Sequence, residues 1–347
     1  MIFVLAGYTF IVIYFTYMEI SIPKSEWDDH LKKLLSAHDL FAPVKTQSHL
    51  DYKQIDEPLI KEIVYNEAKP VSPLKTFFLP VKENVTDGKF SNRPVLILGA
   101  PACDVSALAL LDAIYMDDDY TDPSYSVRRE NTTVISMDCH SIQEHCHCTS
   151  YGIEPGGSKG ADASLAVAGD QVILRTNSQK GEHLVEVMGI REKESPSRVV
   201  LETLEEKMKL VHEQLKEQNS ALPDYESTGV MIAGAPEEVW TRFASSCVSC
   251  GACSAICPTC SCFLLIDRPG FEKVRQLDTC QYPGFERVAG GEDPLCELAV
   301  RFRNRYMCKY VWRPEQHSLK ACTGCGRCTD TCIGQIDKNE LIMSLPN

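Results

Sequence analysis

The sequence predicts an α+β protein made of two unlike parts, and three observations support this division. Two short apolar runs, PVLILGA at 94–100 and TTVISM at 132–137, are typical of buried strands. Predicted helices alternate with these strands, a pattern that favours an α/β domain. Thirteen of the 17 cysteines follow residue 246, so the composition changes sharply near residue 240. We therefore expect an α/β domain over 19–235 and a cysteine-rich domain over 236–347.

The predicted helices frame the first domain. In SIPKSEWDDHLKKLLSAH a helix begins near Ser25, with acidic residues in its first turn and lysines later. The helix DVSALALLDAIY follows the first strand, and the stretch 199–218 has the apolar spacing of a connecting helix. Cys103 and Cys139 come just after the two strands. Because open α/β sheets usually place their sites at the carboxyl ends of strands, we expect these two cysteines to lie at one sheet edge.

The first eighteen residues, MIFVLAGYTFIVIYFTYM, carry no charged side chain. As a helix they would measure about 27 Å, at the lower edge of what spans a bilayer. They lack the positive start and the small-residue cleavage site of a secretory signal, so export is not expected. Two interpretations of 1–18 stay open. One is a membrane anchor on the cytoplasmic face, followed by Lys24, Lys32 and Lys33 as the positive-inside rule requires, and the other is an extension upstream of a chain that starts at Met18.

Composition excludes one class of partner and favours one compartment. The formal net charge of -13 argues against nucleic acid, because phosphate binding depends on clustered Lys and Arg. Cysteines at two- and three-residue spacings indicate metal binding more often than disulfides in an intracellular protein. We therefore expect a cytoplasmic, reducing location.

Two runs of cysteines share the spacing C-x2-C-x2-C-x3-C, which is the signature of bacterial two-cluster ferredoxins. In such proteins the fourth cysteine of each run binds the other cluster. We therefore assign crossed ligands to two [4Fe-4S] clusters. Cluster I takes Cys247, Cys250, Cys253 and Cys332, and cluster II takes Cys322, Cys325, Cys328 and Cys257. Structural zinc is the alternative, although it needs only four ligands in two pairs.

Four further cysteines lie in the α/β part and are candidates for a third [4Fe-4S] site. They are Cys103, Cys139, Cys146 and Cys148. Zinc is a competing occupant because His140, His145 and His147 lie among them and imidazole suits zinc; unligated buried thiols are another. For Cys260, Cys262 and Cys280 both packing around the clusters and ligation stay open. We expect Cys296 and Cys308 to be core thiols.

One basic group stands out in this acidic chain, at Arg301, Arg303 and Arg305. It could dock an acidic partner, offset the negative charge of thiolate clusters, or form a solvated face. The sequence has no G-x-G-x-x-G after a strand, no G-K-[ST] loop and no nucleophile triad signature. A protein without these motifs that carries clusters is expected to conduct electrons rather than to catalyse a reaction.

Eight phrases in order carry a resemblance to a known family. They are PACDVSALALLD, DPSYSVRRE, DCHSIQEHCHC, GADASLAVAGD, CVSCGACSAICPTCSCF, LDTC, RFRNRY and CTGCGRCTDTC. With them the chain resembles a family of iron-sulfur subunits found in cytosolic sulfhydrogenases, as hydrogenase subunit beta, and in anaerobic sulfite reductase. His147 and Cys308 depart from that family, which tends to have an aromatic residue and a histidine there.

The resemblance implies both a fold and a role. It implies an N-terminal α/β region before a two-cluster bacterial-ferredoxin-like domain, and it favours the third [4Fe-4S] cluster because the four cysteines of the α/β part fall on recurring family positions. It also implies a non-catalytic subunit that relays electrons between a flavin- and NAD(P)H-binding subunit and a hydrogenase-like or sulfite-reductase-like catalytic subunit. Two alternatives are a self-contained iron-sulfur reductase of a sulfur compound and a zinc-stabilised binding module.

Overall fold

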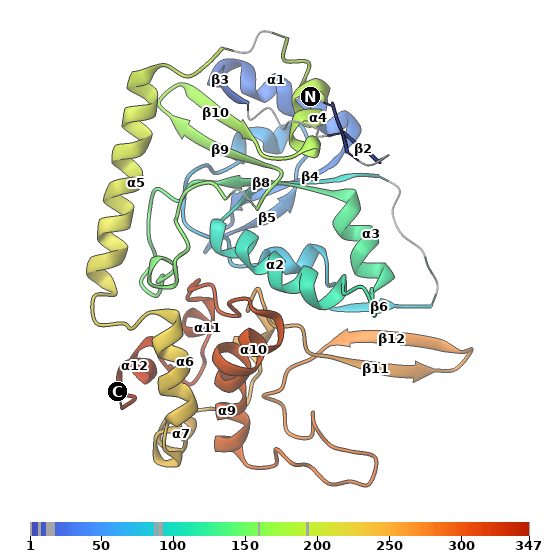
Figure 1. Ribbon diagram of the computed structural model, residues 1–347, viewed down its shortest axis with the longest axis vertical. Coiled ribbons are helices and arrows are strands. Elements are labelled where there is room, and N and C mark those ends of the chain that lie inside the picture. Colours follow the sequence, from blue (N-terminus) through green and yellow to red (C-terminus); the bar gives the residue numbers. More distant parts are fainter. Residues whose placement is uncertain are drawn as a thin grey trace.

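The computed structural model describes residues 2–5, 8–11, 18–86, 88, 93–158, 160–191 and 194–346. Figure 1 shows two layers of structure along the long axis, with a sheet and its helices at one end and a cysteine-rich region of short helices at the other. A long helix, α5 (Arg198–Gln218), runs along one side and leads from the first region to the second. The predicted α+β class and the connecting helix are confirmed.

A seven-stranded mixed sheet forms the first region, in the order β3-β10-β9-β8-β7-β4-β5. Its four central strands, β4 (Asp39–Lys45), β7 (Val95–Ala100), β8 (Thr132–Met137) and β9 (Ala163–Ala168), run parallel. The outer strands, β3 (Glu19–Pro23), β10 (Gln171–Thr176) and β5 (Leu50–Gln54), pair antiparallel. The two predicted strands are therefore the middle of the sheet, where both faces are covered and continuous apolar runs are expected.

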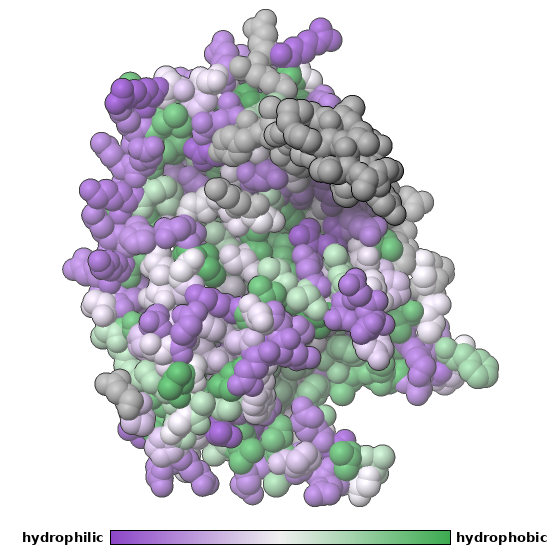
Figure 2. Space-filling view, in the orientation of Figure 1, coloured by the Kyte–Doolittle hydropathy of each residue, from purple (hydrophilic) through white to green (hydrophobic). Residues whose placement is uncertain are grey.

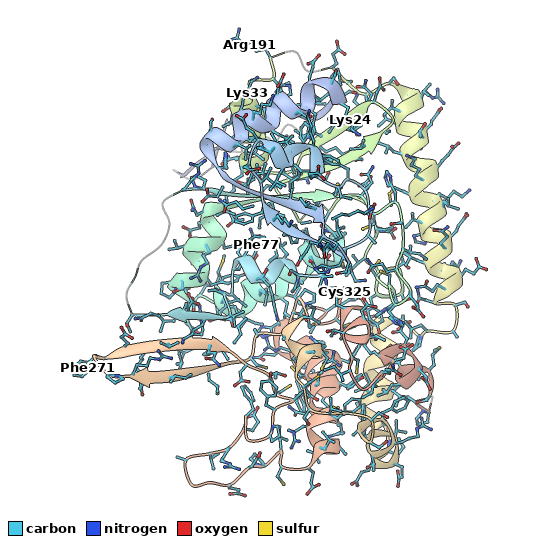
Figure 3. The ribbon with its side chains drawn as sticks, turned by 180° about the vertical axis from the view of Figure 1, so that it is seen from behind. Lys24, Lys33, Phe77, Arg191, Phe271 and Cys325 are labelled. Atoms are coloured by element: carbon cyan, nitrogen blue, oxygen red, sulfur yellow. The ribbon has the colours of Figure 1, made fainter. Side chains whose placement is uncertain are left out.

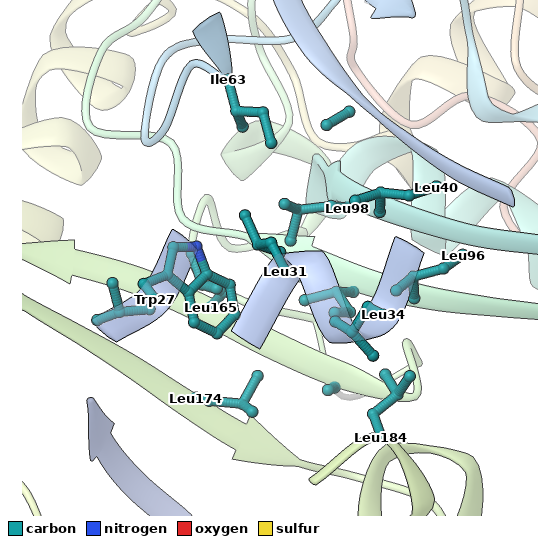
Figure 4. Close-up of a cluster of buried hydrophobic side chains, with 14 of the residues drawn as sticks. Trp27, Leu31, Leu34, Leu40, Ile63, Leu96, Leu98, Leu165, Leu174 and Leu184 are labelled. Atoms are coloured by element: carbon teal, nitrogen blue, oxygen red, sulfur yellow. The ribbon is translucent and has the colours of Figure 1, made fainter. Parts of the chain in front are cut away.

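Helices cover both faces of this sheet. On one face α1 (Lys24–Ala37) packs against α4 (Gln179–Met188), and Figure 4 shows Trp27, Leu31 and Leu34 of α1 in the core beneath them. The other face carries α2 (Ala102–Tyr115) and α3 (Pro123–Asn131), while α5 packs on β9. Figure 2 shows hydrophilic side chains gathered on the side where α5 lies. The burial of both sheet faces fixes the strand ends that carry Cys103 and Cys139.

Short helices around an aromatic core make up the second region. They are α6 (Tyr225–Gly234), α7 (Glu237–Ala244), α8 (Ala252–Ala255), α9 (Leu298–Met307), the π-helix η4 (Cys308–Trp312), α10 (Arg313–His317), α11 (Arg327–Asp330) and α12 (Lys338–Met343). Trp240, Phe302 and Tyr306 contact one another in this core. Tyr225 of α6 belongs to it too, although it precedes residue 236. The domain limits stay a prediction.

A hairpin extends from the second region and joins the first. Its strands are β11 (Phe263–Arg268) and β12 (Glu272–Leu277), and β12 also pairs antiparallel with β6 (Lys82–Asn84). The buried guanidinium of Arg275 forms ion pairs with Glu83 and Asp122 at this junction. Figure 3 shows Phe271 at the far end of the hairpin, where its side chain is fully exposed. The two regions thus share a three-stranded sheet.

Three short 3₁₀ helices complete the first region, η1 (Pro58–Glu62), η2 (Leu74–Phe77) and η3 (Thr149–Tyr151). At the N-terminus β1 (Ile2–Leu5) pairs antiparallel with β2 (Tyr8–Ile11). The remainder of the predicted apolar segment 1–18, apart from Met18, lies outside the described residues. In the part of the chain that the structure describes, no helix combines the length and apolar character needed to cross a membrane.

Candidate metal centre

The third group of cysteines lies at the carboxyl edge of the parallel strands. Cys103 is in the first turn of α2, directly after β7, and Cys139 follows β8 by two residues. Cys146 and Cys148 come from the loop after β8, and all four line one small cavity together with Lys69. The structure therefore brings together the four cysteines that the sequence singles out, at the edge where we expected them.

Burial shapes the chemistry of these thiols. It raises the pKa of Cys148 to about 12 and the pKa of Cys103 and Cys139 well above the ordinary range, with nearby thiols and carboxylates adding to the rise. Lys69 lies opposite, with Nζ 3.5 Å from the Cys146 sulfur and 3.3 Å from an Asp330 oxygen. Buried thiols become thiolates when a metal coordinates them. The donor set thus fits a bound metal group.

A second small cavity contains the first ferredoxin run. Cys247, Cys250 and Cys253 line it, and Cys332 from the second run lines it as well. This is the grouping that crossed ligation requires of cluster I. Cys328 also borders the cavity, so the two runs are close neighbours. The assignment of individual ligands stays a prediction.

The cysteines assigned to cluster II gather between the two cavities. Cys257 and Cys328 both lie near Cys325, which itself borders the cavity of the third group. Cys257, Cys322 and Cys325 are buried. Figure 3 shows Cys325 at the junction of the two regions. The second run is thus placed between the first run and the third group.

Two glycines allow the second run to approach the third group. A Cβ atom on Gly324 would lie 2.6 Å from the carbonyl oxygen of His147, and one on Gly326 would meet the carbonyl oxygen of His145. Both glycines also have positive φ angles, which side chains rarely adopt. The His147 N–H donates to the Gly324 carbonyl at 2.9 Å. Loop 322–328 therefore packs directly on loop 139–148.

A buried ion pair joins the same two loops. The Arg327 guanidinium contacts the Asp104 carboxylate through two hydrogen bonds, of 2.5 and 2.9 Å, and donates to the Pro70 carbonyl at 2.8 and 3.0 Å. Both side chains are almost fully buried, at 3% and 0% exposure. Burial alone lowers the pKa of Arg327, but Asp104 and the neighbouring cysteines raise it above its usual value. Arg327 lies between two cluster cysteines, and Asp104 follows Cys103.

Lys338 is a second buried cation at this junction. Its Nζ lies 2.8 Å from His147 Nε2, 2.9 Å from the Tyr310 hydroxyl and 3.9 Å from the Cys322 sulfur. Burial and this ammonium both lower the pKa of His147, so its ring is held neutral. Sequence reasoning missed Arg327 and Lys338. The signal available for Arg327 was a basic residue inside a cysteine run that otherwise holds small or polar residues.

The basic group near residue 303 has a different role from a docking patch. Arg301 and Arg305 are both buried. Arg301 donates to the carbonyls of Leu295 and Cys296, while Cys253 and Cys328 raise the pKa of Arg305 against the effect of burial. The expectation of a solvated face is wrong for these two arginines. Arg305 instead offsets the charge of cluster cysteines.

The remaining cysteines are divided between two environments. Cys296 is exposed, so the expectation of a core thiol is wrong for it: it lies in the long connection between β12 and α9. Cys308 is partly buried at the start of η4. Among the residues that the structure describes, no group of three or more His, Cys, Asp or Glu side chains is arranged to hold a single metal ion.

Residues 246–336 match the family model of the 4Fe-4S dicluster domain. The chain carries a 4Fe-4S dicluster domain. This domain contains both cysteine runs and the β11–β12 hairpin. The whole chain is also similar to sulfhydrogenase 2 subunit beta of Pyrococcus furiosus, with 28% identity over 328 residues that cover 89% of this chain and 92% of that protein. Together the two matches confirm the predicted resemblance to an iron-sulfur subunit family.

Proposed function

We propose that this protein is the electron-relay subunit of an oxidoreductase complex. It binds two [4Fe-4S] clusters through the dicluster domain and a third through Cys103, Cys139, Cys146 and Cys148. When bound, a [4Fe-4S] cluster takes up and gives back single electrons. The observation that carries the proposal is the contiguity of the three cysteine groups, since the second run contacts both the first run and the third group.

The protein's own residues supply what such a relay needs. Cys253 of the first run and Cys328 of the second act on the same Arg305 guanidinium, and Cys325 of the second run borders the cavity of the third group. Electron transfer falls steeply with distance, so adjacent groups favour transfer along the row. Buried cations beside each group favour the reduced, more negative state of the site.

The partners follow from what the chain lacks and from its relative. Hydride transfer from NAD(P)H is flavin chemistry, and the sequence offers no dinucleotide fingerprint. The similar protein from Pyrococcus furiosus is named as a subunit of a sulfhydrogenase. We therefore assign to this chain a flavin- and NAD(P)H-binding subunit on one side and a hydrogenase-like or sulfite-reductase-like catalytic subunit on the other.

The test uses the full chain, purified without oxygen, both alone and from its native host. Alone it should be brown, be reduced by dithionite, and show no turnover with NAD(P)H and sulfite, polysulfide or hydrogen. From the host it should copurify with a flavoprotein and a catalytic subunit. Turnover by the isolated chain would replace the relay with a self-contained reductase. One equivalent of zinc and no chromophore would replace it with a zinc-stabilised module.

A further inference from the structure

Four cysteines lie outside the three groups described above and gather at the base of the hairpin. Cys262 precedes β11 and Cys280 follows β12, and their thiols are joined by a hydrogen bond. The Asp278 N–H donates to the Cys262 carbonyl at 2.9 Å, which holds the two chain segments together. Cys308, at the start of η4, lies close to Cys262. Three elements that are distant in sequence thus bring thiols to one place.

Cys260 completes the group from the dicluster side. Its thiol contacts Cys257, the ligand assigned to cluster II, and it shares the ammonium of Lys309 with Cys308. The Cys260 carbonyl accepts a hydrogen bond from Lys75 Nζ at 3.0 Å. The set of Cys260, Cys262, Cys280 and Cys308 therefore adjoins the dicluster domain.

Three buried cations surround this set. Lys75, Arg305 and Lys309 have 3%, 5% and 5% of their surface exposed. Within the described ranges none of them has a carboxylate at ion-pair distance. A buried cation is costly without a compensating negative charge. Lys75 Nζ has only carbonyl acceptors, Ser254 O at 3.3 Å and Cys260 O, so the charge that balances these cations must come from thiolates.

Two buried polar atoms beside Cys280 lack partners in the described part of the chain. They are the Ser254 hydroxyl and the Arg305 Nε. Ser254 is 1% exposed, and both side chains act on Cys280. A buried polar atom without a hydrogen-bond partner usually marks a strained site or an acceptor supplied by a bound group. Gln281 is already committed, since its Nε2 bonds the Cys280 sulfur at 3.5 Å and the Arg301 carbonyl at 2.8 Å.

We propose that Cys260, Cys262, Cys280 and Cys308 bind a fourth [4Fe-4S] cluster at the base of the β11–β12 hairpin. Four thiols match the ligand count of one cubane. The three cations and the two unpaired donors then face the negative charge of the site. This inference rests on the proposed relay and extends it by one centre, toward the projecting hairpin.

The test measures iron, acid-labile sulfide and zinc per chain in the full-length protein, purified without oxygen. The double variant Cys262→Ser/Cys280→Ser should hold about four fewer irons than the wild-type chain, since one cubane has four. The matched control Cys296→Ser removes an exposed thiol and should leave the iron content unchanged. Iron content in the double variant equal to that of the wild type would overturn the fourth cluster, as would the loss of one zinc in place of iron.

A second variant keeps the test decisive if the double variant does not fold. Cys308→His retains a side chain that binds iron, so the iron content should stay the same while the electron paramagnetic resonance signal of one reduced centre changes. Signals identical to those of the wild type would exclude Cys308 as a ligand and overturn the proposal. A wild-type chain with about eight or twelve irons, unchanged in the double variant, would leave the relay intact, whereas a chain without iron would end the relay itself.

Discussion

The change Asp104→Asn tests whether the buried ion pair holds the two regions together. The substitution keeps the shape of the side chain and one acceptor oxygen for the Leu74 N–H, which donates to Asp104 at 3.0 Å. It removes the charge opposite the Arg327 guanidinium. Arg327 keeps its hydrogen bonds to the Pro70 carbonyl, but its charge is left buried and unpaired. The change therefore isolates the electrostatic part of the contact.

The expected loss of stability is large because both side chains are almost fully buried. Removing one partner of a buried ion pair costs about 3–5 kcal/mol. Since 1.36 kcal/mol corresponds to a factor of ten, the folding equilibrium should fall by about 150- to 5,000-fold. The double variant Asp104→Asn/Arg327→Gln should lose less than the single variant, because no uncompensated charge stays buried.

Anaerobic urea unfolding, followed by tryptophan fluorescence, measures these differences from the unfolding midpoints. The control is Glu67→Gln, which breaks the ion pair with Lys45 at 2.7 Å, where both side chains are exposed. This control should lose less than about 1 kcal/mol. If Asp104→Asn cost no more than the control, the ion pair would not hold the regions together and the reasoning from burial would be wrong.

Three other predictions concern the clusters and pH. Cys332→Ala should damage the centre of the first run and spare that of the second, as seen by electron paramagnetic resonance; loss of the second centre alone would refute crossed ligation. Gly324→Ala should reduce the iron bound by the third group, because its Cβ would strike the His147 carbonyl; unchanged iron would contradict the close packing. Burial lowers the pKa of His38 below its unfolded value of about 6.5. The stability that the neutral ring contributes is therefore present above about pH 6.5 and is lost as the pH falls through the folded pKa, so His38→Gln should show a smaller decline between pH 7 and 5 in urea unfolding, and an equal decline would exclude His38 as the cause.

Local patterns predicted much of the fold. The apolar runs at 94–100 and 132–137 became the central parallel strands because buried strands need no alternation, and the helices followed from their spacing. The position of Cys103 and Cys139 at one sheet edge followed from the strand order that such folds adopt. Periodicity and strand topology were therefore sufficient for these elements.

The contacts that join the regions could not be predicted in this way. Arg327 and Asp104 are 223 residues apart, and Lys338 and His147 are 191 apart. No periodic pattern records such a pairing, because each side chain is an isolated charge in its own segment. The strand β6 was missed for the same reason: three polar residues form a strand only because β12 offers an edge. Cys296 was misplaced because a cysteine in a loop has no periodic neighbours to report its exposure.

The sheet shared by β6 and β12 sets an order of events during synthesis. Glu83 of β6 and its partner Arg275 of β12 are separated by 192 residues. At about 5–20 residues per second, a ribosome delivers Arg275 roughly 10–40 s after Glu83. For that interval β6 has no partner edge and Glu83 has no guanidinium. The nascent N-terminal region must therefore wait, with an open edge, until the second half of the protein emerges.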